Sequence, residues 1–167
     1  MHSAHITLAP CAPAHYPALT AYRLSGEQAS FSRAPCDWLN GSIPYSATQL
    51  AVSILRDGEA IGFFVLDSGA DRAAYSANPR AVVLRSMSLN PKHQGNGHAY
   101  AALTATCLNP FVQAHLPACE EIVLGVHHAN HSAVRLYQRA GFHDSGRTHM
   151  GLKGLQYIYY RQIARAD

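Results

Sequence analysis

The segment from His93 to Leu103, HQGNGHAYAAL, constrains the fold more than any other part of the chain. It places Gly95 and Gly97 one residue apart, between a β-rich run (VVLRSMSLN) and a helix-forming run (AYAAL). Glycine adopts positive φ easily and lets the backbone come close to a ligand. The start of a helix also presents unpaired N–H groups and a partial positive charge. The sequence therefore predicts a strand, a glycine turn and a helix, an arrangement that can hold a phosphate.

Two well-known phosphate motifs do not match this segment. A Walker A loop needs Gly-Lys-Ser or Gly-Lys-Thr after the first glycine, and none follows here. The dinucleotide fingerprint needs a third glycine, but His98, Ala99 and Tyr100 follow Gly97. A tight turn without a ligand explains the two glycines equally well. The segment alone leaves both interpretations open.

The rest of the chain has the pattern of an α+β protein, because strand-like and helix-like runs alternate irregularly along it. Asp57-Gly58 stands between two β-rich runs and predicts a hairpin. Pro110 predicts a helix break near Asn109. The predicted strands are residues 5–10, 48–56, 59–67, 82–91, 120–128, 142–150 and 155–164, and the predicted helices are 12–31, a short one within 32–47, 99–108 and 130–141.

Composition narrows the class of protein. With 167 residues, 48% of them hydrophobic and 14% charged, the chain is long and apolar enough for a single domain, residues 1–167, with its own core. The net charge of +3 is scattered, which argues against a nucleic-acid partner. No apolar run of membrane-spanning length and no signal-peptide pattern occur, so we expect a cytoplasmic protein without a membrane partner. The four cysteines form no CxxC pair and are expected to be free thiols.

Two motifs in the correct order connect the glycine turn to a known family. LNPKHQGNGHA resembles motif A of the GCN5-related N-acetyltransferase (GNAT) superfamily, with Gln94, Gly97 and Ala99 at the defining positions and Gly95 in a slot that is commonly glycine. About thirty residues further on, IVLGVHHANHSAVRLYQRAGF resembles motif B, which has a strand, Asn130, Tyr137 and a Gly-Phe pair after the helix. The chain is identified as a member of this superfamily, similar to the small bacterial-type members.

The resemblance implies a fold and a co-substrate. The fold would be a central, mixed, mostly antiparallel sheet of about seven strands flanked by about four helices, splayed open at the acetyl-CoA site. The pantetheine arm of acetyl-CoA would pair with the strand edge at Met87 and Leu89, like an added strand. Its pyrophosphate would bind the N–H groups of the turn residues, which are Gln94, Gly95, Asn96, Gly97, His98 and Ala99.

The resemblance also implies roles in acetyl transfer to an amine. Tyr137 would act as the general acid that protonates the departing thiolate, and the Leu89 N–H would stabilise the charge that develops on the thioester oxygen. Asn130 lies seven residues before Tyr137, about two helical turns, so the two side chains share a face. Asn130 would contact the pantetheine arm. Without motif A, the pattern would favour an ordinary core tyrosine at this position.

The sequence gives less information about the residues that would bind the acceptor amine or take its proton. No general base can be identified, although Glu27 lies in the early helical region that shapes the acceptor pocket in this family. Strand alternation places Arg85 on the face of Val83 and Met87, where it either contacts the substrate or forms an internal salt bridge. The run HHANH, residues 127–131, lacks the HExxH pattern of zinc peptidases, and we predict no metal site.

The functional prediction is an acetyl-CoA-dependent N-acetyltransferase. It would move the acetyl group to a primary amine of a small molecule, by direct attack in a ternary complex. Two alternatives remain open: a non-catalytic module that binds or senses acyl-CoA, and a protein acetyltransferase acting on an N-terminus or a lysine. Family members are often homodimers, but no stretch of this sequence indicates an interface. The identity of the acceptor amine stays open.

Overall fold

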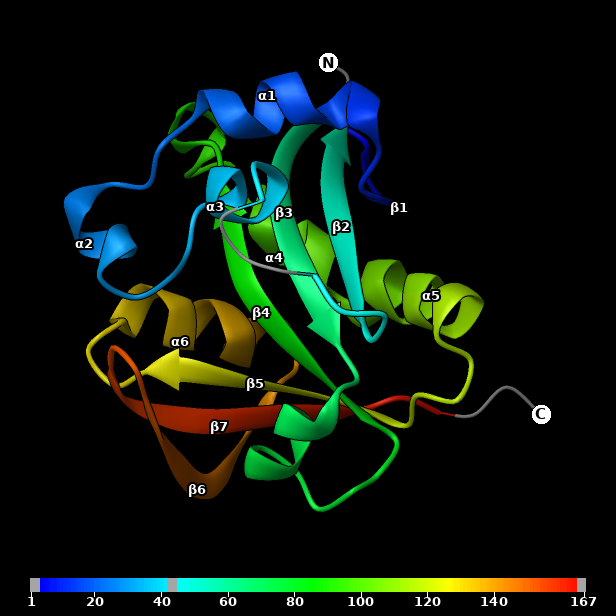
Figure 1. Cartoon of the computed structure of the whole chain (residues 1–167), viewed down its shortest axis with the longest axis vertical. Helices are drawn as coiled ribbons and strands as arrows, with labels where there is room; N and C mark the ends of the chain where they lie inside the picture. Colours follow the sequence, from blue (N-terminus) through cyan, green and yellow to red (C-terminus); the bar gives the residue numbers. More distant parts are fainter. Residues whose placement is uncertain (1–3, 42–44, 165–167) are drawn as a thin grey trace.

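The computed structural model describes residues 4–41 and 45–164. Residues 42–44, which belong to the segment 32–47 with the predicted short helix, lie outside the described residues. One seven-stranded sheet runs through the protein in the order β1-β2-β3-β4-β5-β7-β6 (Figure 1). All neighbouring strands are antiparallel except β4 and β5, which are parallel. The predicted mixed, mostly antiparallel sheet is therefore confirmed. The strands are β1 Ile6–Pro10, β2 Gln49–Arg56, β3 Glu59–Asp67, β4 Ala81–Leu89, β5 Glu121–His127, β6 His143–Gly151 and β7 Gly154–Gln162.

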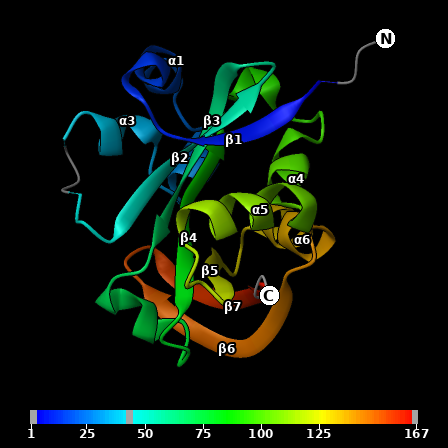
Figure 2. The same cartoon turned by 90° about the vertical axis from the view of Figure 1, so that its right-hand side faces the viewer.

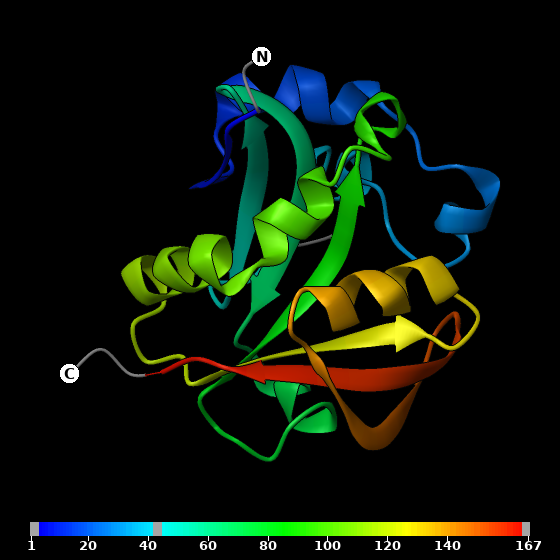
Figure 3. The ribbon, with the colours of Figure 1, turned by 180° about the vertical axis from the view of Figure 1, so that it is seen from behind.

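Helices cover both faces of the sheet. Figures 2 and 3 show α4, α5 and α6 on one face, with α1 and α3 on the other. The described residues contain six α-helices, two more than predicted, because two long predicted helices are each divided. The α-helices are α1 Tyr16–Ala21, α2 Gly26–Ala29, α3 Pro35–Leu39, α4 His98–Leu103, α5 Ala105–His115 and α6 His131–Arg139, and the short 3-10 helices are η1 Pro13–His15, η2 Ala70–Ala74 and η3 Pro91–His93.

The first helical prediction, residues 12–31, is wrong as a single helix. The chain leaves helical geometry at Tyr22, which is extended with φ −100° and ψ 156°. This turns the Tyr22 ring into the protein, where its hydroxyl lies 2.8 Å from the Ser88 hydroxyl. Ser25 then starts α2 by accepting a hydrogen bond from the Gln28 N–H at 3.3 Å. A buried tertiary contact has overridden the local helical pattern.

The predicted break near Asn109 is also wrong. The chain leaves helical geometry at Thr104, with φ −59° and ψ 152°, and Pro110 lies inside α5. The Leu103 carbonyl accepts a 2.6 Å hydrogen bond from the Arg161 guanidinium instead of continuing the helix. The Thr104 hydroxyl donates to the Ala101 carbonyl at 3.0 Å. A buried side chain from the last strand therefore decides where α4 ends.

The hairpin prediction at Asp57-Gly58 is confirmed. Both residues have positive φ, 49° and 87°, as a type I′ turn requires. The turn joins β2 to β3, and β3 is buried from Ala60 to Asp67. The main core packs the sheet against α4, α5 and α6, and a smaller cluster packs α1 and α3 against β3. The middle of the sheet is thus held rigidly from both sides.

A β-bulge in β4 shapes the centre of the molecule. Ser86 has φ 55°, and the register with β3 shifts between Phe63 and Val65. Because of this extra residue, Met87 packs with Leu84 in the main core, whereas Val83 lies in a cluster on the other face. The prediction that Met87 shares a face with Val83 and Arg85 is therefore wrong, since simple alternation does not pass through a bulge.

The two parallel strands separate beyond their first residues. β4 and β5 pair from Ala81 with Glu121 to Val83 with Val123. Beyond that point β5 continues its pairing with β7 alone, as far as His127 with Gln156. The remainder of β4 therefore has an open edge facing the end of β5, which is the predicted splay (Figure 1).

Candidate active site

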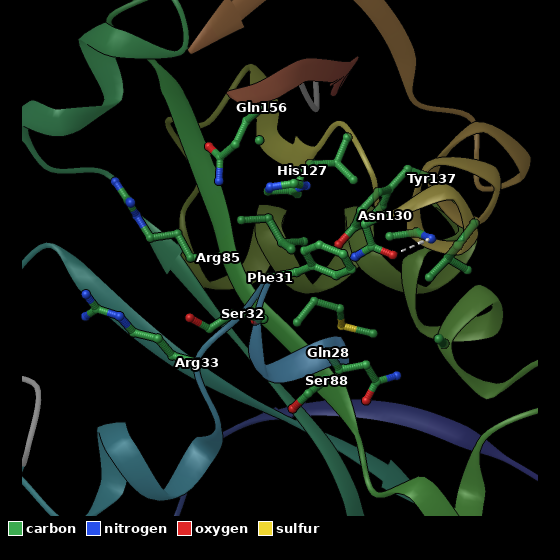
Figure 4. Close-up of a pocket in the computed structure, with 18 of the residues that line it drawn as sticks. Gln28, Phe31, Ser32, Arg33, Arg85, Ser88, His127, Asn130, Tyr137 and Gln156 are labelled. Atoms are coloured by element: carbon green, nitrogen blue, oxygen red, sulfur yellow. Dashed lines mark hydrogen bonds between the residues drawn. The ribbon is translucent and has the colours of Figure 1, made fainter. Parts of the chain in front are cut away.

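A cavity of about 750 Å³ occupies the gap between the separated strands. Its wall includes the glycine turn, the open edge of β4, one face of α6, and the β6–β7 hairpin (Figure 4). Most residues that the sequence singled out line this one cavity; they are Arg85, Met87, Leu89, Gln94, Gly95, Gly97, His98, Ala99, Asn130 and Tyr137. Glu27 and Asn96 are not part of its lining.

The glycine turn has the geometry of an anion cradle. Gly95 and Gly97 have φ of 81° and 77°, the left-handed region that favours glycine, and nothing lies within 4 Å of a Cβ built at either position. Among the described residues, no acceptor is hydrogen-bonded to the backbone N–H groups from Gly95 to Ala99. Gln94 differs, because its N–H already donates to the Pro91 carbonyl at 3.2 Å. Five successive amides can therefore bind a phosphate oxygen.

Gln94 supports the turn through its side chain. Its Nε2 lies 3.3 Å from both the Leu89 carbonyl and Gln28 Oε1. It therefore connects the start of the turn to the end of β4 and to α2. Asn96 Nδ2 donates to the Gln94 carbonyl at 3.4 Å, and this keeps the Asn96 side chain on the turn itself.

The open edge of β4 exposes backbone groups to the cavity. Asn90 donates its N–H to the Ile61 carbonyl of β3 at 2.8 Å. Because hydrogen-bonding direction alternates along an antiparallel strand, the N–H of Leu89 points away from β3 and toward the open edge. Met87 and Leu89 both line the cavity there. A ligand laid along this edge can pair with the strand.

Asn130 and Tyr137 lie on the cavity side of α6, as their spacing predicts (Figure 4). Asn130 is the N-cap of α6, and its Oδ1 accepts from the Ala133 N–H at 3.3 Å. Tyr137 is only 8% exposed, and no described residue is hydrogen-bonded to its hydroxyl. Burial raises the pKa of the phenol well above its ordinary value, so the group carries its proton at neutral pH.

Two serines of β4 anchor the opposite helical layer. Ser86 accepts a hydrogen bond from the Trp38 indole at 3.0 Å, and Ser88 is bonded to Tyr22 at 2.8 Å. Both serines also line the cavity. Their hydroxyls hold α1 and α3 in place along the bulged strand.

Arg85 forms the internal salt bridge that was one of its two predicted roles. Its Nε donates to Asp67 at 3.1 Å, and the guanidinium lies 5.4 Å from the centre of the Tyr75 ring. Arg85 also lines the cavity, so the second predicted role stays open. Glu27 instead lies in the exposed first turn of α2.

The histidine cluster is held by hydrogen bonds. His127 Nδ1 accepts from the Ala129 N–H at 3.1 Å, which leaves Nε2 to donate to the Lys153 carbonyl at 3.0 Å. The ring stacks on Phe31 at 4.7 Å and on His128 at 4.5 Å. Within residues 4–41 and 45–164, no group of three or more His, Cys, Asp or Glu side chains is placed to hold a metal ion.

Several cavity residues carry no signal in the sequence. Arg139 lies over the Tyr100 ring, 4.9 Å from its centre, near the glycine turn. Arg33, Lys153 and Gln156 line the opposite end. Arg33 is far in the sequence from Lys153 and Gln156, and none of these three belongs to either motif, so only the folded chain brings them to one cavity.

A sheet opened between two parallel strands, with free amides at one end of the gap and a buried phenol beside it, defines the class of acyl-CoA-dependent N-acetyltransferases. The chain belongs to the Acetyltransferase (GNAT) family, whose profile matches residues 14–142. It is 36% identical over 156 residues to the uncharacterized N-acetyltransferase YbbJ of Bacillus subtilis (strain 168), across 93% of this chain and 96% of that protein. The protein is thus an N-acetyltransferase, as predicted.

Solved structures of low sequence identity share the fold. The aminoglycoside acetyltransferase AAC(6')-Ib in complex with coenzyme A superposes with a TM-score of 0.74 at 16% identity, covering 95% of both chains. The spermidine N-acetyltransferase of Vibrio cholerae, with CoA and spermine, gives 0.65 at 16% identity, covering 94% of this chain and 95% of that one. The ribosomal-protein-S18-alanine N-acetyltransferase of Escherichia coli gives 0.63 at 17% identity, covering 98% and 97%. Across the part of the chain that the structure describes, no helix has the length and apolar character needed to cross a bilayer.

Proposed function

We propose that this enzyme uses acetyl-CoA to acetylate a primary amine of a small molecule, by direct attack in a ternary complex. One observation carries the proposal: Tyr137, whose hydroxyl has no hydrogen-bond partner among the described residues, lines the same cavity as four of the five turn residues whose amides are free. An acid and an anion cradle in one cavity are what acetyl transfer from a CoA thioester requires.

The residues present fit acetyl-CoA. The amides from Gly95 to Ala99 would bind its pyrophosphate, and the free edge at Met87 and Leu89 would pair with its pantetheine arm. Asn130 would contact that arm from α6. Arg139, which is exposed beside the turn, would add a positive charge to the phosphate end. When bound, acetyl-CoA supplies the activated acetyl group.

The proposed roles in the reaction follow from these positions. The amine nitrogen would form a bond to the acetyl carbon while the carbon–sulfur bond breaks and the thiolate leaves. The proton that the attacking nitrogen gives up would pass through water and replace the one that Tyr137 donates to the thiolate. The Leu89 N–H would stabilise the negative charge on the acetyl oxygen, and Tyr137 would give its proton to the thiolate. An alkyl ammonium has an ordinary pKa of about 10, so the amine must also lose a proton before attack. The two carboxylates that line the cavity, Asp67 and Asp71, both lie in ion-pair contact with Arg85, and we propose that water takes this proton.

The shape of the cavity supports a small acceptor. Lys153, in the β6–β7 hairpin, donates to the carbonyls of Ala29 and Ser32 at 2.6 and 3.1 Å. Phe31, between them, stacks on His127. This bridge joins the β6–β7 hairpin to α2 and the segment after it at the wall of the cavity, and we infer that it favours a small acceptor over a protein substrate, which would need an open groove. By their names, one structural neighbour acts on aminoglycosides, one on spermidine and one on an alanine of ribosomal protein S18.

A Tyr137→Phe variant tests the catalytic proposal against a module that only binds acyl-CoA. CoA release would be measured with a panel of amines, with acetyl-CoA held fixed. We expect kcat to fall by about 100-fold, with CoA affinity nearly unchanged, because only the acid is lost. Tyr157→Phe is the matched control, since Tyr157 is exposed and outside the cavity lining. Thiol release that needs no amine and ignores Tyr137→Phe would refute the catalytic role.

A further inference from the structure

The end of the cavity away from the glycine turn has an unusual charge balance. We call it the acceptor end and define it by its charged residues Arg33, Asp67, Asp71, Arg85 and Lys153. Three carry positive charge and two carry negative charge, so the acceptor end is positive overall. A site for a polyamine would need the opposite balance, with several free carboxylates.

The buried carboxylate of this end is already fully engaged. Asp67 accepts from Arg85 Nε at 3.1 Å, from Gln49 Nε2 at 3.2 Å and from the Gly69 N–H at 2.8 Å. Its side chain is 6% exposed. A carboxylate with three donors has little capacity left for a substrate ammonium group. The other carboxylate, Asp71, is 86% exposed and points its charge largely into solvent.

Arg85 keeps unused donors at the cavity wall. Only its Nε donates a hydrogen bond within the described residues, to Asp67. Nη2 is buried without a hydrogen-bond partner, 4.0 Å from Asp71. A buried donor left unpaired costs about 1–3 kcal/mol, which a ligand oxygen can recover. Nη1, the other terminal nitrogen, forms no hydrogen bond with a described residue, and a guanidinium is well suited to bind a carboxylate or a phosphate.

A complementary unpaired acceptor lies nearby. Gln156 Oε1 is buried without a partner, and Gln156 lines the cavity. A Cβ built on Gly125 would meet both Gln156 Oε1 and the Tyr75 ring, so this oxygen lies beside the ring that Arg85 stacks on. Figure 4 shows Arg85 and Gln156 on the same side of the cavity. The partial negative charge of this oxygen favours an ammonium group on this side of the cavity, next to an oxyanion on the guanidinium.

Arg33 provides a second positive charge without a partner. It is exposed, lines the cavity from the segment between α2 and α3, and forms no ion pair or hydrogen bond with the described residues. In Figure 4 its side chain extends along the same side of the view as Arg85. Its charge adds to the positive field that an incoming anion meets.

From these contacts we infer that the acceptor is a small amine that also carries an oxyanion, a carboxylate or a phosphate, gripped by Arg85 and attracted by Arg33. The inference rests on the proposed acetyltransferase function and adds the chemical class of its acceptor. It places the oxyanion at the Tyr75 side of the cavity, two residues along β4 from Met87.

The test compares four short amines of similar length: β-alanine with a carboxylate, phosphoethanolamine with a phosphate, ethanolamine without charge on its second group, and 1,3-diaminopropane with a second ammonium. We expect kcat/KM to be at least about tenfold higher for an anionic amine than for ethanolamine, and lowest for the diamine. The two anionic amines show which oxyanion is preferred.

Two variants link this preference to the residues. Arg33→Met is expected to reduce the ratio of kcat/KM for anionic over neutral amine by about tenfold, since Arg33 is exposed and its removal leaves no buried group unpaired. Arg85→Lys keeps the charge beside Asp67 but loses the planar fork, and should reduce the same ratio. Arg135→Met, on the exposed side of α6 outside the cavity lining, is the control and should leave the ratio unchanged.

Three possible results distinguish a failure of the inference about the acceptor from a failure of the proposed acetyltransferase function. If the neutral amine or the diamine reacts as well as the anionic amines, the inference is overturned while the acetyltransferase proposal stands. The same holds if Arg33→Met and Arg85→Lys leave the ratio unchanged. If no amine reacts at all, the proposed function fails, and calorimetric binding of the four amines to the CoA complex decides the charge preference: tighter binding of the anionic amines supports it, and equal binding overturns it.

Discussion

Arg161 of β7 ties together the two helices that flank the candidate cofactor site. It is 7% exposed, and its guanidinium donates to the carbonyls of Leu103 at 2.6 Å and Ala140 at 2.7 Å, and to Asn109 Oδ1 at 3.0 Å. These acceptors lie at the end of α4, at the end of α6 and in α5. The guanidinium also lies 4.5 Å from the Phe142 ring centre. A positive charge at two helix C-termini is favourable.

Replacing Arg161 with methionine should cost about 3 kcal/mol of unfolding free energy. The three hydrogen bonds contribute about 1 kcal/mol each after the cost of desolvation, and methionine can donate none of them. Burial lowers the pKa of Arg161 to about 10, which shows that desolvation already opposes part of this gain. For a domain of this size, the melting temperature should fall by about 6–12 °C. Arg161→Lys should lose part of this amount, because one ammonium cannot reach three spread acceptors.

Chemical denaturation and thermal melting followed by circular dichroism would measure the change, with a CoA titration on the folded variant. CoA affinity should fall as well, because α4 and α6 lose their shared anchor. Arg135→Met is the control, since this exposed arginine should change stability by less than about 0.5 kcal/mol. A loss below about 1 kcal/mol for Arg161→Met would refute the view that the guanidinium anchors these helix ends.

Three further predictions follow from the site. Gly97→Val should lower the free energy of unfolding by about 1–2 kcal/mol, because φ at this position is 77° and the added Cβ meets no atom. The variant should also weaken CoA binding by at least about tenfold in a fluorescence titration, since its backbone is less able to keep the turn conformation. Unchanged binding would contradict the role of the turn amides. Tyr22→Phe and Ser88→Ala should each cost about 1 kcal/mol, and the double variant little more than either, because they share one hydrogen bond; additive losses in urea denaturation would speak against this. Burial and nearby positive charge lower the pKa of His98, so its ring is largely neutral at pH 7. A bound pyrophosphate should raise this pKa, so CoA binding should be accompanied by proton uptake. Calorimetry in buffers of different ionisation enthalpy measures the uptake, and proton release on binding would contradict the prediction.

The features that were predicted correctly depend on short stretches of chain. The hairpin at Asp57-Gly58, the glycine turn and the helix that starts at Asn130 each arise from a few neighbouring residues. Their conformations follow from the φ that glycine permits and from local hydrogen bonds. The placement of Asn130 and Tyr137 on one face follows from the helical repeat.

The features that were missed depend on distant partners. The break after Leu103 is held by Arg161, 58 residues further on, and the kink at Tyr22 is held by Ser88, 66 residues further on. The bulge at Ser86 changes which face Met87 occupies, and Ser86 is bonded to Trp38, 48 residues away. A local sequence pattern contains no information about such distant contacts. A buried hydrogen bond to a distant residue can outweigh the local helix or strand propensity of the chain.

The amino-acid sequence by itself determined the family, the order of the strands and the glycine turn before α4, because each is encoded in neighbouring residues whose backbone preferences agree. Only the tertiary structure decided what the acceptor end of the cavity contains. Arg33, Arg85 and Lys153 meet there from three separate elements, and Asp67 is occupied by a partner of its own. The charge balance of a cavity depends on which side chains come together in space, so it is set only when the chain folds.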